Sequence, residues 1–202
     1  MRIGIDFDNT LIDYDRVFLD AAKERGLIDA SFVGSKRAVR DRIRLLPEGE
    51  LAWQRLQGYV YGAGISGAVL CAGAADFLRE CRDRGAEVFV VSHKTQFGHY
   101  DPQRVDLRAA ALGWMADRGF FRPELYRLAR ENVYFEATRA EKLRRIGALG
   151  CTVFIDDLEE VFTDPAFPPG VKPILFAPSS ARGLAVHPDW RRIGEIVLGE
   201  HG

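Results

Sequence analysis

The feature that most constrains the fold is the alternation of short apolar strands with amphipathic helices along the second half of the chain. Strands that are apolar on both faces and separated by helices form parallel sheets through right-handed crossovers, with helices over both faces. We expect strands at residues 2–7, 87–91, 132–135, 152–155 and 173–176, and helices over 74–84, 105–117, 139–149 and 190–198. The pattern therefore predicts an α/β fold, a Rossmann-like three-layer α/β/α core with a parallel sheet.

Residues 27–70 do not share this alternation. They contain basic, amphipathic stretches that predict helices over 36–46 and 50–61, and they contain no convincing core strand. A glycine-rich run at 62–73 is typical of a linker or hinge. We therefore expect a small helical domain at residues 14–70, inserted after the first strand of a core formed by residues 1–13 and 71–202.

Composition excludes several classes of function. The formal net charge of -1 provides no positive excess for binding nucleic acid through its phosphates. No stretch of the sequence is apolar for long enough to span a membrane, and the N-terminus becomes acidic at Asp6, which is unlike a signal peptide. The three cysteines, Cys71, Cys81 and Cys151, predict neither a disulfide framework nor a zinc site. We expect a cytoplasmic protein that binds neither nucleic acid nor membrane.

Acidic residues stand at the ends of two predicted strands. Asp6 and Asp8 lie at the end of the first strand, on one side of it because strand side chains alternate with period two. Asp156 and Asp157 end the strand predicted at 152–155. Either pair alone is typical of a turn or a helix cap. Since the carboxyl ends of parallel strands meet at one edge of a sheet, where ligands bind, the two pairs together predict an oxygen-rich site suited to Mg²⁺.

Four segments resemble the motifs of the haloacid dehalogenase-like (HAD) hydrolase superfamily. These segments are Asp6-Phe7-Asp8-Asn9-Thr10, Val90-Val91-Ser92, Lys142 and Phe154-Ile155-Asp156-Asp157. The resemblance covers residues 1 to about 160 and implies that the insert at 14–70 is a cap over the leaving group. Asn9 departs from the family pattern, which commonly has Gly there. Asn tolerates turn conformations nearly as well, so we expect activity to be retained.

The resemblance implies roles for the two carboxylates of the first motif. Asp6 is the expected nucleophile, which forms an aspartyl-phosphate. Asp8 is the expected general acid for the leaving group and then the general base for water. Family members that cleave carbon–halogen bonds lack this second Asp, so its presence favours phosphate-ester hydrolysis.

The resemblance also implies the ligands of the metal and of the phosphoryl group. The expected Mg²⁺ site consists of Asp6, the backbone carbonyl of Asp8, and Asp156 with Asp157 in support. The resemblance does not decide which of Asp156 and Asp157 binds the metal directly. Ser92 and Lys142 are the expected ligands of the phosphoryl oxygens. Asn9, Thr10 and His93 are further candidates for phosphate binding, and Thr10 is also expected to buttress the turn.

Two regions are candidates for selecting the substrate. The polar segment 92–101 follows the second motif, and its Lys94 and His99 are weaker candidates for substrate contacts. The spacing of the basic residues within 36–44 is typical of a helix face exposed to solvent. The alternative is that these residues contact an anionic substrate.

The sequence therefore predicts a Mg²⁺-dependent phosphomonoester hydrolase that acts on a small phosphorylated metabolite, whether a sugar phosphate, a nucleotide or another compound. A phosphotransferase and a non-catalytic module that binds phosphate and Mg²⁺ are the alternatives. A response-regulator receiver is disfavoured because its phosphorylated Asp would follow a later strand. The sequence carries no signal for an oligomeric state.

Overall fold

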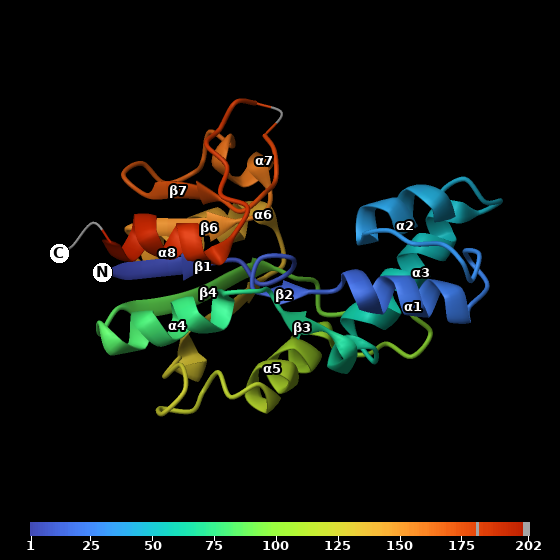
Figure 1. Cartoon of the computed structure of the whole chain (residues 1–202), viewed down its shortest axis with the longest axis horizontal. Coiled ribbons are helices and arrows are strands. Elements are labelled where there is room, and N and C mark those ends of the chain that lie inside the picture. Colours follow the sequence, from blue (N-terminus) through green and yellow to red (C-terminus); the bar gives the residue numbers. More distant parts are fainter. Residues whose placement is uncertain (181, 200–202) are drawn as a thin grey trace. The chain divides into compact units, whose positions relative to one another are not determined.

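The computed structural model of the chain describes residues 1–180 and 182–199 (Figure 1). These residues form two compact units. The sheet unit consists of Met1–Ile12, Leu70–Lys94 and the chain from Gly119 onward, and the helical unit consists of Asp13–Val69 and Thr95–Arg118. Within the described part of the chain, no helix combines the length and the apolar character needed to cross a membrane.

The sheet unit contains a five-stranded sheet in which every pairing is parallel. Its strands are β1 (Arg2–Ile5), β4 (Glu87–His93), β5 (Val133–Glu136), β6 (Val153–Asp156) and β7 (Lys172–Leu175). The order across the sheet is β5-β4-β1-β6-β7, so that β1, the first strand of the chain, lies at the centre. This arrangement confirms the predicted α/β fold with a parallel sheet.

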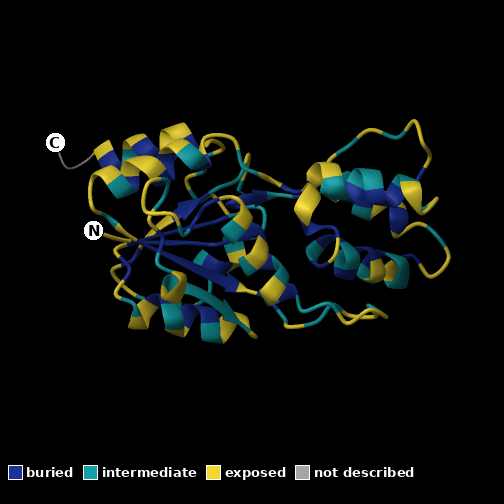
Figure 2. Cartoon of the chain, turned by 90° about the horizontal axis from the view of Figure 1, so that it is seen from below, coloured by how far each residue is buried: buried dark blue, intermediate teal, exposed yellow. Residues whose placement is uncertain are grey.

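Helices cover both faces of the sheet, which explains why the middle residues of the strands are apolar. On one face α4 (Ala74–Asp83) and α8 (Trp190–Leu198) pack against each other, while α6 (Arg139–Ala148) packs against β4 and β5. The α6 face has a buried core that includes Phe89, Leu143 and Phe154. In Figure 2 most of the sheet is coloured as buried, whereas the edge strand β5 is of intermediate burial over its whole length. The sheet unit also contains a 3₁₀ helix at Arg130–Asn132 and the short helix α7 (Glu159–Phe162).

Gly4 lets an aromatic side chain pack directly on the central strand. A Cβ atom built at this position would lie 2.5 Å from Cδ2 of Phe154 and 3.0 Å from Sγ of Cys151. Such distances are far inside van der Waals contact, so any side chain at residue 4 would displace the Phe154 ring. The absence of a side chain at residue 4 therefore leaves room for the Phe154 ring, two residues before the acidic ends of β1 and β6.

The helical unit is built around aromatic side chains. Its helices are α1 (Asp15–Glu24), α2 (Lys36–Ile43), α3 (Gly49–Tyr61) and α5 (Leu107–Asp117), with a 3₁₀ helix at Ile65–Gly67. The rings of Phe18 and Trp53 stack with their centroids 4.9 Å apart, and Tyr14 meets Tyr61 edge to face at the same distance. Helix caps set the beginnings of two helices: Ser35 accepts from the Ala38 amide, and Asp106 accepts from the amides that follow it.

The boundary of the helical unit differs from the expected domain at residues 14–70. Residues 95–118, which were expected in the core, belong to the helical unit. The reason is that α5 packs against α3 and the 3₁₀ helix at 65–67, and the Trp114 indole donates to the Ala68 carbonyl at 3.1 Å. The glycine-rich run also contains more structure than a linker, because β3 (Val69–Leu70) pairs with β2 (Ile12–Asp13).

Candidate active site

Three adjacent strands deliver polar side chains to the carboxyl edge of the sheet. Asp6 follows β1 directly, and its amide donates to the Ile155 carbonyl of β6 at 2.9 Å. Asp156 is the last residue of β6, and Ser92 is the next to last residue of β4. All three side chains are buried. The parallel order of β4, β1 and β6 is what brings these sequence-distant residues to one edge.

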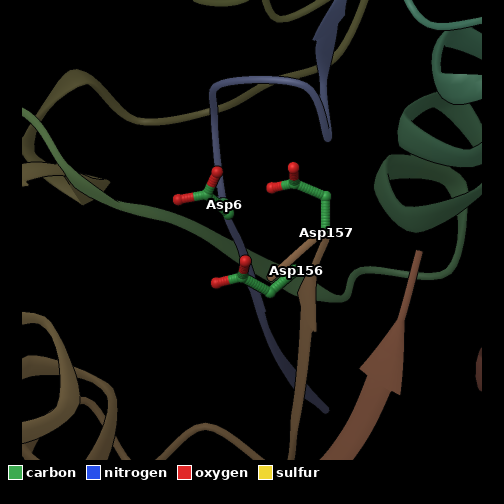
Figure 3. A group of neighbouring side chains, drawn as sticks. All are labelled: Asp6, Asp156 and Asp157. Atoms are coloured by element: carbon green, nitrogen blue, oxygen red, sulfur yellow. The ribbon is translucent and has the colours of Figure 1, made fainter. Parts of the chain in front are cut away.

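Asp6, Asp156 and Asp157 form a cluster of carboxylates (Figure 3). Each offers one oxygen, and these oxygens all lie within 4.8 Å of one another. Asp6 and Asp156 are buried, whereas Asp157 is partly exposed. An all-oxygen set of this kind is what a hard cation such as Mg²⁺ prefers, so the residues present fit the expected metal.

Lys142 lies between two of these carboxylates. Its Nζ atom is 2.6 Å from Oδ1 of Asp6 and 2.6 Å from Oδ2 of Asp156, and its side chain is 2% exposed. Burial alone would lower the pKa of the ammonium group, but the charges of Asp6 and Asp156 outweigh burial and raise it. Burial also raises the pKa of Asp156, with Asp6 adding to the rise and Lys142 opposing it. Lys142 is therefore a fixed positive charge in the site.

The beginning of α6 places Lys142. The Thr138 hydroxyl accepts from the Glu141 amide, while the Glu141 carboxylate accepts from the Thr138 amide, which is a complete capping box. A capping box fixes both the first residue of a helix and its direction. Lys142 follows immediately, and the neighbouring Leu143 anchors the helix in the core.

The turn after β1 is tight and left-handed at one residue. Asn9 has a φ of 60°, and its amide donates to the Ile12 carbonyl. This conformation favours glycine and tolerates asparagine, which agrees with the expectation that Asn9 replaces a family glycine without loss of the turn.

Thr10 links that turn to the carboxylate cluster. It is fully buried, its hydroxyl donates to Oδ1 of Asp157 at 3.4 Å, and its carbonyl accepts from the Trp190 indole at 3.1 Å. The contact to Asp157 is long, so Thr10 orients that carboxylate weakly while the indole of α8 holds the turn itself.

The structure places Lys94 on Asp8, an interaction that sequence reasoning missed. Nζ of Lys94 lies 2.8 Å from Oδ2 and 3.1 Å from Oδ1 of Asp8. Lys94 had been expected to contact substrate. The sequence did carry a signal that Lys94 faces the site. Side chains alternate along a strand, so Lys94, the residue after β4, lies on the same side as Ser92, which was already assigned to the site.

The two histidine candidates lie elsewhere. The exposed His93 points to the other side of β4 from Ser92, and its Nε2 lies 2.9 Å from the Ala137 carbonyl. His99 is exposed and belongs to the helical unit, in the segment before α5. Contacts among the described side chains at the strand ends form two sets. One set consists of Asp6, Asp156, Asp157, Lys142 and Thr10, and the other is the pair of Asp8 and Lys94, while Ser92 lies buried near the end of β4.

Searches by sequence do not identify a relative of this chain. No family model matches it, and no curated protein matches it.

Several solved structures have the same fold. A haloacid dehalogenase-like hydrolase from Streptococcus pneumoniae is 14% identical with a TM-score of 0.58, covering 100% of this chain and 98% of that one. The protein tyrosine kinase A of Mycobacterium tuberculosis is 15% identical with a TM-score of 0.63, covering 98% of this chain and 97% of that one. A HAD-family hydrolase from Deinococcus radiodurans, solved with phosphate and sodium bound, is 17% identical with a TM-score of 0.54, covering 98% and 95%.

These similarities show the fold and not the activity, because one fold can support different activities. The matched proteins themselves include both hydrolases and a protein named as a kinase. The sequence motifs and the parallel sheet order lead independently to the same architecture. The chain therefore has the fold of the haloacid dehalogenase-like hydrolases.

Proposed function

We propose that this protein is a Mg²⁺-dependent phosphomonoester hydrolase that acts on a small phosphorylated metabolite through an aspartyl-phosphate. The observation that carries the proposal is the cluster of Asp6, Asp156 and Asp157 with Lys142 bridging two of its members, while Asp8 stands on the same strand end as Asp6. Hydrolase neighbours with the same fold support it.

Asp6 and Asp8 divide the chemistry between them. An oxygen of the Asp6 carboxylate attacks phosphorus, the ester P–O bond breaks, and the leaving oxygen takes a proton from the Asp8 carboxyl group. In the second step Asp8 removes a proton from water, the water oxygen bonds to phosphorus, and the electron pair of the Asp6–phosphorus bond returns to Asp6. The products are an alcohol and inorganic phosphate.

The remaining residues bind charge. Asp6, the carbonyl of Asp8, Asp156 and Asp157 would hold Mg²⁺, which when bound offsets the repulsion between the carboxylates and a phosphate dianion. Ser92 and Lys142 bind the phosphoryl oxygens in this proposal, with the turn at Asn9 and Thr10 shaping the pocket for them.

Hydrolysis of p-nitrophenyl phosphate tests the proposal. The purified protein should release p-nitrophenol with MgCl₂ and stop with EDTA, and Asp6→Asn should abolish release. Asp83→Asn, an exposed aspartate on α4, is the matched control and should retain wild-type activity. Activity that survives Asp6→Asn in a correctly folded variant contradicts the mechanism.

A panel of phosphorylated metabolites then separates the alternatives. A phosphatase releases inorganic phosphate in equal amount to the dephosphorylated product. A phosphotransferase instead releases less phosphate when an acceptor alcohol is added. A protein that binds phosphate and Mg²⁺ in calorimetry but turns over no member of the panel is the non-catalytic module.

A further inference from the structure

A second lysine is buried at the active edge, apart from Lys142. Lys94 is 4% exposed, and its ammonium group has a carboxylate partner in Asp8. A buried lysine is costly unless it is paired, so its retention at this position calls for a physical reason. The pair lies wholly within the sheet unit, between the turn after β1 and the residue after β4.

The geometry constrains Asp8 strongly. Nζ of Lys94 reaches both oxygens of the carboxylate, at 2.8 and 3.1 Å, which fixes the rotation of the group as well as its position. Lys94 is itself held from two sides. Its amide donates to the Glu136 carbonyl of β5 at 2.9 Å, and its ammonium lies 5.7 Å from the centroid of the Phe7 ring. The lysine is thus a rigid support, because both its backbone and its side chain are fixed.

The two buried lysines serve different carboxylates. Lys142 contacts Asp6 and Asp156, and Lys94 contacts Asp8. The orientation that Lys94 gives to the Asp8 carboxylate bears on the second half of the proposed reaction, in which Asp8 takes a proton from water.

We propose that Lys94 is a positioning residue that orients the Asp8 carboxylate as the base for hydrolysis of the aspartyl-phosphate. This inference rests on the proposed function. In the step concerned, one water O–H bond breaks and its proton goes to Asp8. The water oxygen bonds to phosphorus, and the P–O bond to Asp6 breaks with its electron pair returning to Asp6. Lys94 transfers no proton and acts only by holding the carboxylate of Asp8.

Pre-steady-state kinetics of Lys94→Met test this assignment. With p-nitrophenyl phosphate, whose leaving group departs without a proton, formation of the phosphoenzyme should continue while its hydrolysis slows by about 100-fold. The variant should release a burst of p-nitrophenol close to one equivalent of enzyme, followed by a slow steady state. Lys94→Arg, which keeps the charge, should recover part of the steady-state rate, and Lys172→Met, an exposed lysine on β7, should behave as wild type.

Other results would overturn the assignment. Slow p-nitrophenol release without a burst would mean that Lys94 acts on binding or on the first step, and wild-type kinetics would mean that it has no role. If Lys94→Met fails to fold, Asp8→Asn/Lys94→Met removes both charges of the pair, and it should lose no more activity than Asp8→Asn alone. A further loss in the double variant contradicts the inference. A wild-type protein that hydrolyses no aryl phosphate contradicts the proposed function itself, which is a distinguishable outcome.

Discussion

Ion pairs at the carboxyl edge of the sheet and ion pairs on the helices α1–α3 occupy opposite environments. At the sheet edge the pairs of Lys94 and Lys142 involve side chains that are at most 19% exposed. On the helices the pairs Arg16–Asp20, Arg40–Asp41 and Arg44–Glu50 involve side chains that are at least 35% exposed. The near-neutral net charge therefore averages two populations. Removing the buried charges from water costs free energy that their ion pairs must offset, whereas the exposed charges interact mainly with water.

The basic helix α2 shows the second environment most clearly. Arg37, Arg42 and Arg44 are exposed, as expected for a solvated helix face. Lys36 and Arg40 are of intermediate burial, and the Lys36 ammonium donates to the Tyr61 hydroxyl at 2.8 Å and lies 5.2 Å from the centroid of the Phe18 ring. One member of the basic run thus joins the aromatic core of the helical unit.

Lys142→Met provides the strongest test of this contrast. The change leaves two buried carboxylates without their counterion, so we expect the free energy of unfolding to fall by about 3–5 kcal/mol. Phosphatase activity should also disappear. Urea denaturation measures the first effect, and p-nitrophenyl phosphate hydrolysis measures the second. A stability loss no larger than that of an exposed pair would show that the edge is more hydrated than its burial indicates.

Gly4→Ala tests packing beneath the same edge without changing any charge. The new Cβ would overlap Cδ2 of Phe154 at 2.5 Å, and overpacking of this kind costs about 1–3 kcal/mol. Gly113→Ala is the matched control, since nothing lies within 4 Å of a Cβ there and alanine favours a helix. Thermal unfolding should move in opposite directions for the two variants. Equal shifts would contradict the packing argument.

Arg145→Met examines an ion pair of intermediate exposure. Arg145 lies 2.7 Å from Glu136 at the end of β5, and the two side chains are 41% and 17% exposed. Because water screens much of the interaction, we expect a loss of about 0.5 kcal/mol in urea denaturation. A fall in the free energy of unfolding as large as that of Lys142→Met would show that burial does not determine how much an ion pair contributes to stability.

Arg44→Ala should have the smallest effect. Its partner Glu50 lies at the surface, where hydrogen bonds from Arg44 and then Gln54 lower the pKa of the Glu50 carboxyl group. Solvent screening leaves little net stabilisation, so the melting temperature should stay within experimental error at both low and high salt. A clear destabilisation at low salt that disappears at high salt would show that the surface charges act together.

The sequence predicted the parts of the fold that depend on local pattern. The alternation of strands and helices identified all five strands of the parallel sheet, and the rule for strand ends brought Asp6 and Asp156 to one edge. The predicted ends of the strands were less accurate. The strand predicted at 87–91 continues to His93, because Ser92 and His93 pair with Phe135 and Glu136 of β5. Elements as short as β2, β3 and α7 lack enough residues to show a period.

What escaped prediction depends on contacts between distant residues. The pattern of α5 is that of any amphipathic helix, so only its packing against α3 assigns residues 95–118 to the helical unit. The pairing of Lys94 with Asp8 joins residues that follow different strands. Alternation puts Lys94 on the side of Ser92, but no local spacing encodes its distance to Asp8.

The central position of β1 governs the order in which the chain can fold. Arg2 lies opposite Glu87 on one side and Ile3 opposite Val153 on the other, so β1 is synthesised before both of the strands that pair with it. The helical unit also stays incomplete until residue 118 has been made. Closing such long loops slows folding. On the ribosome, we therefore expect β1 to remain unprotected from proteases until β6 has emerged.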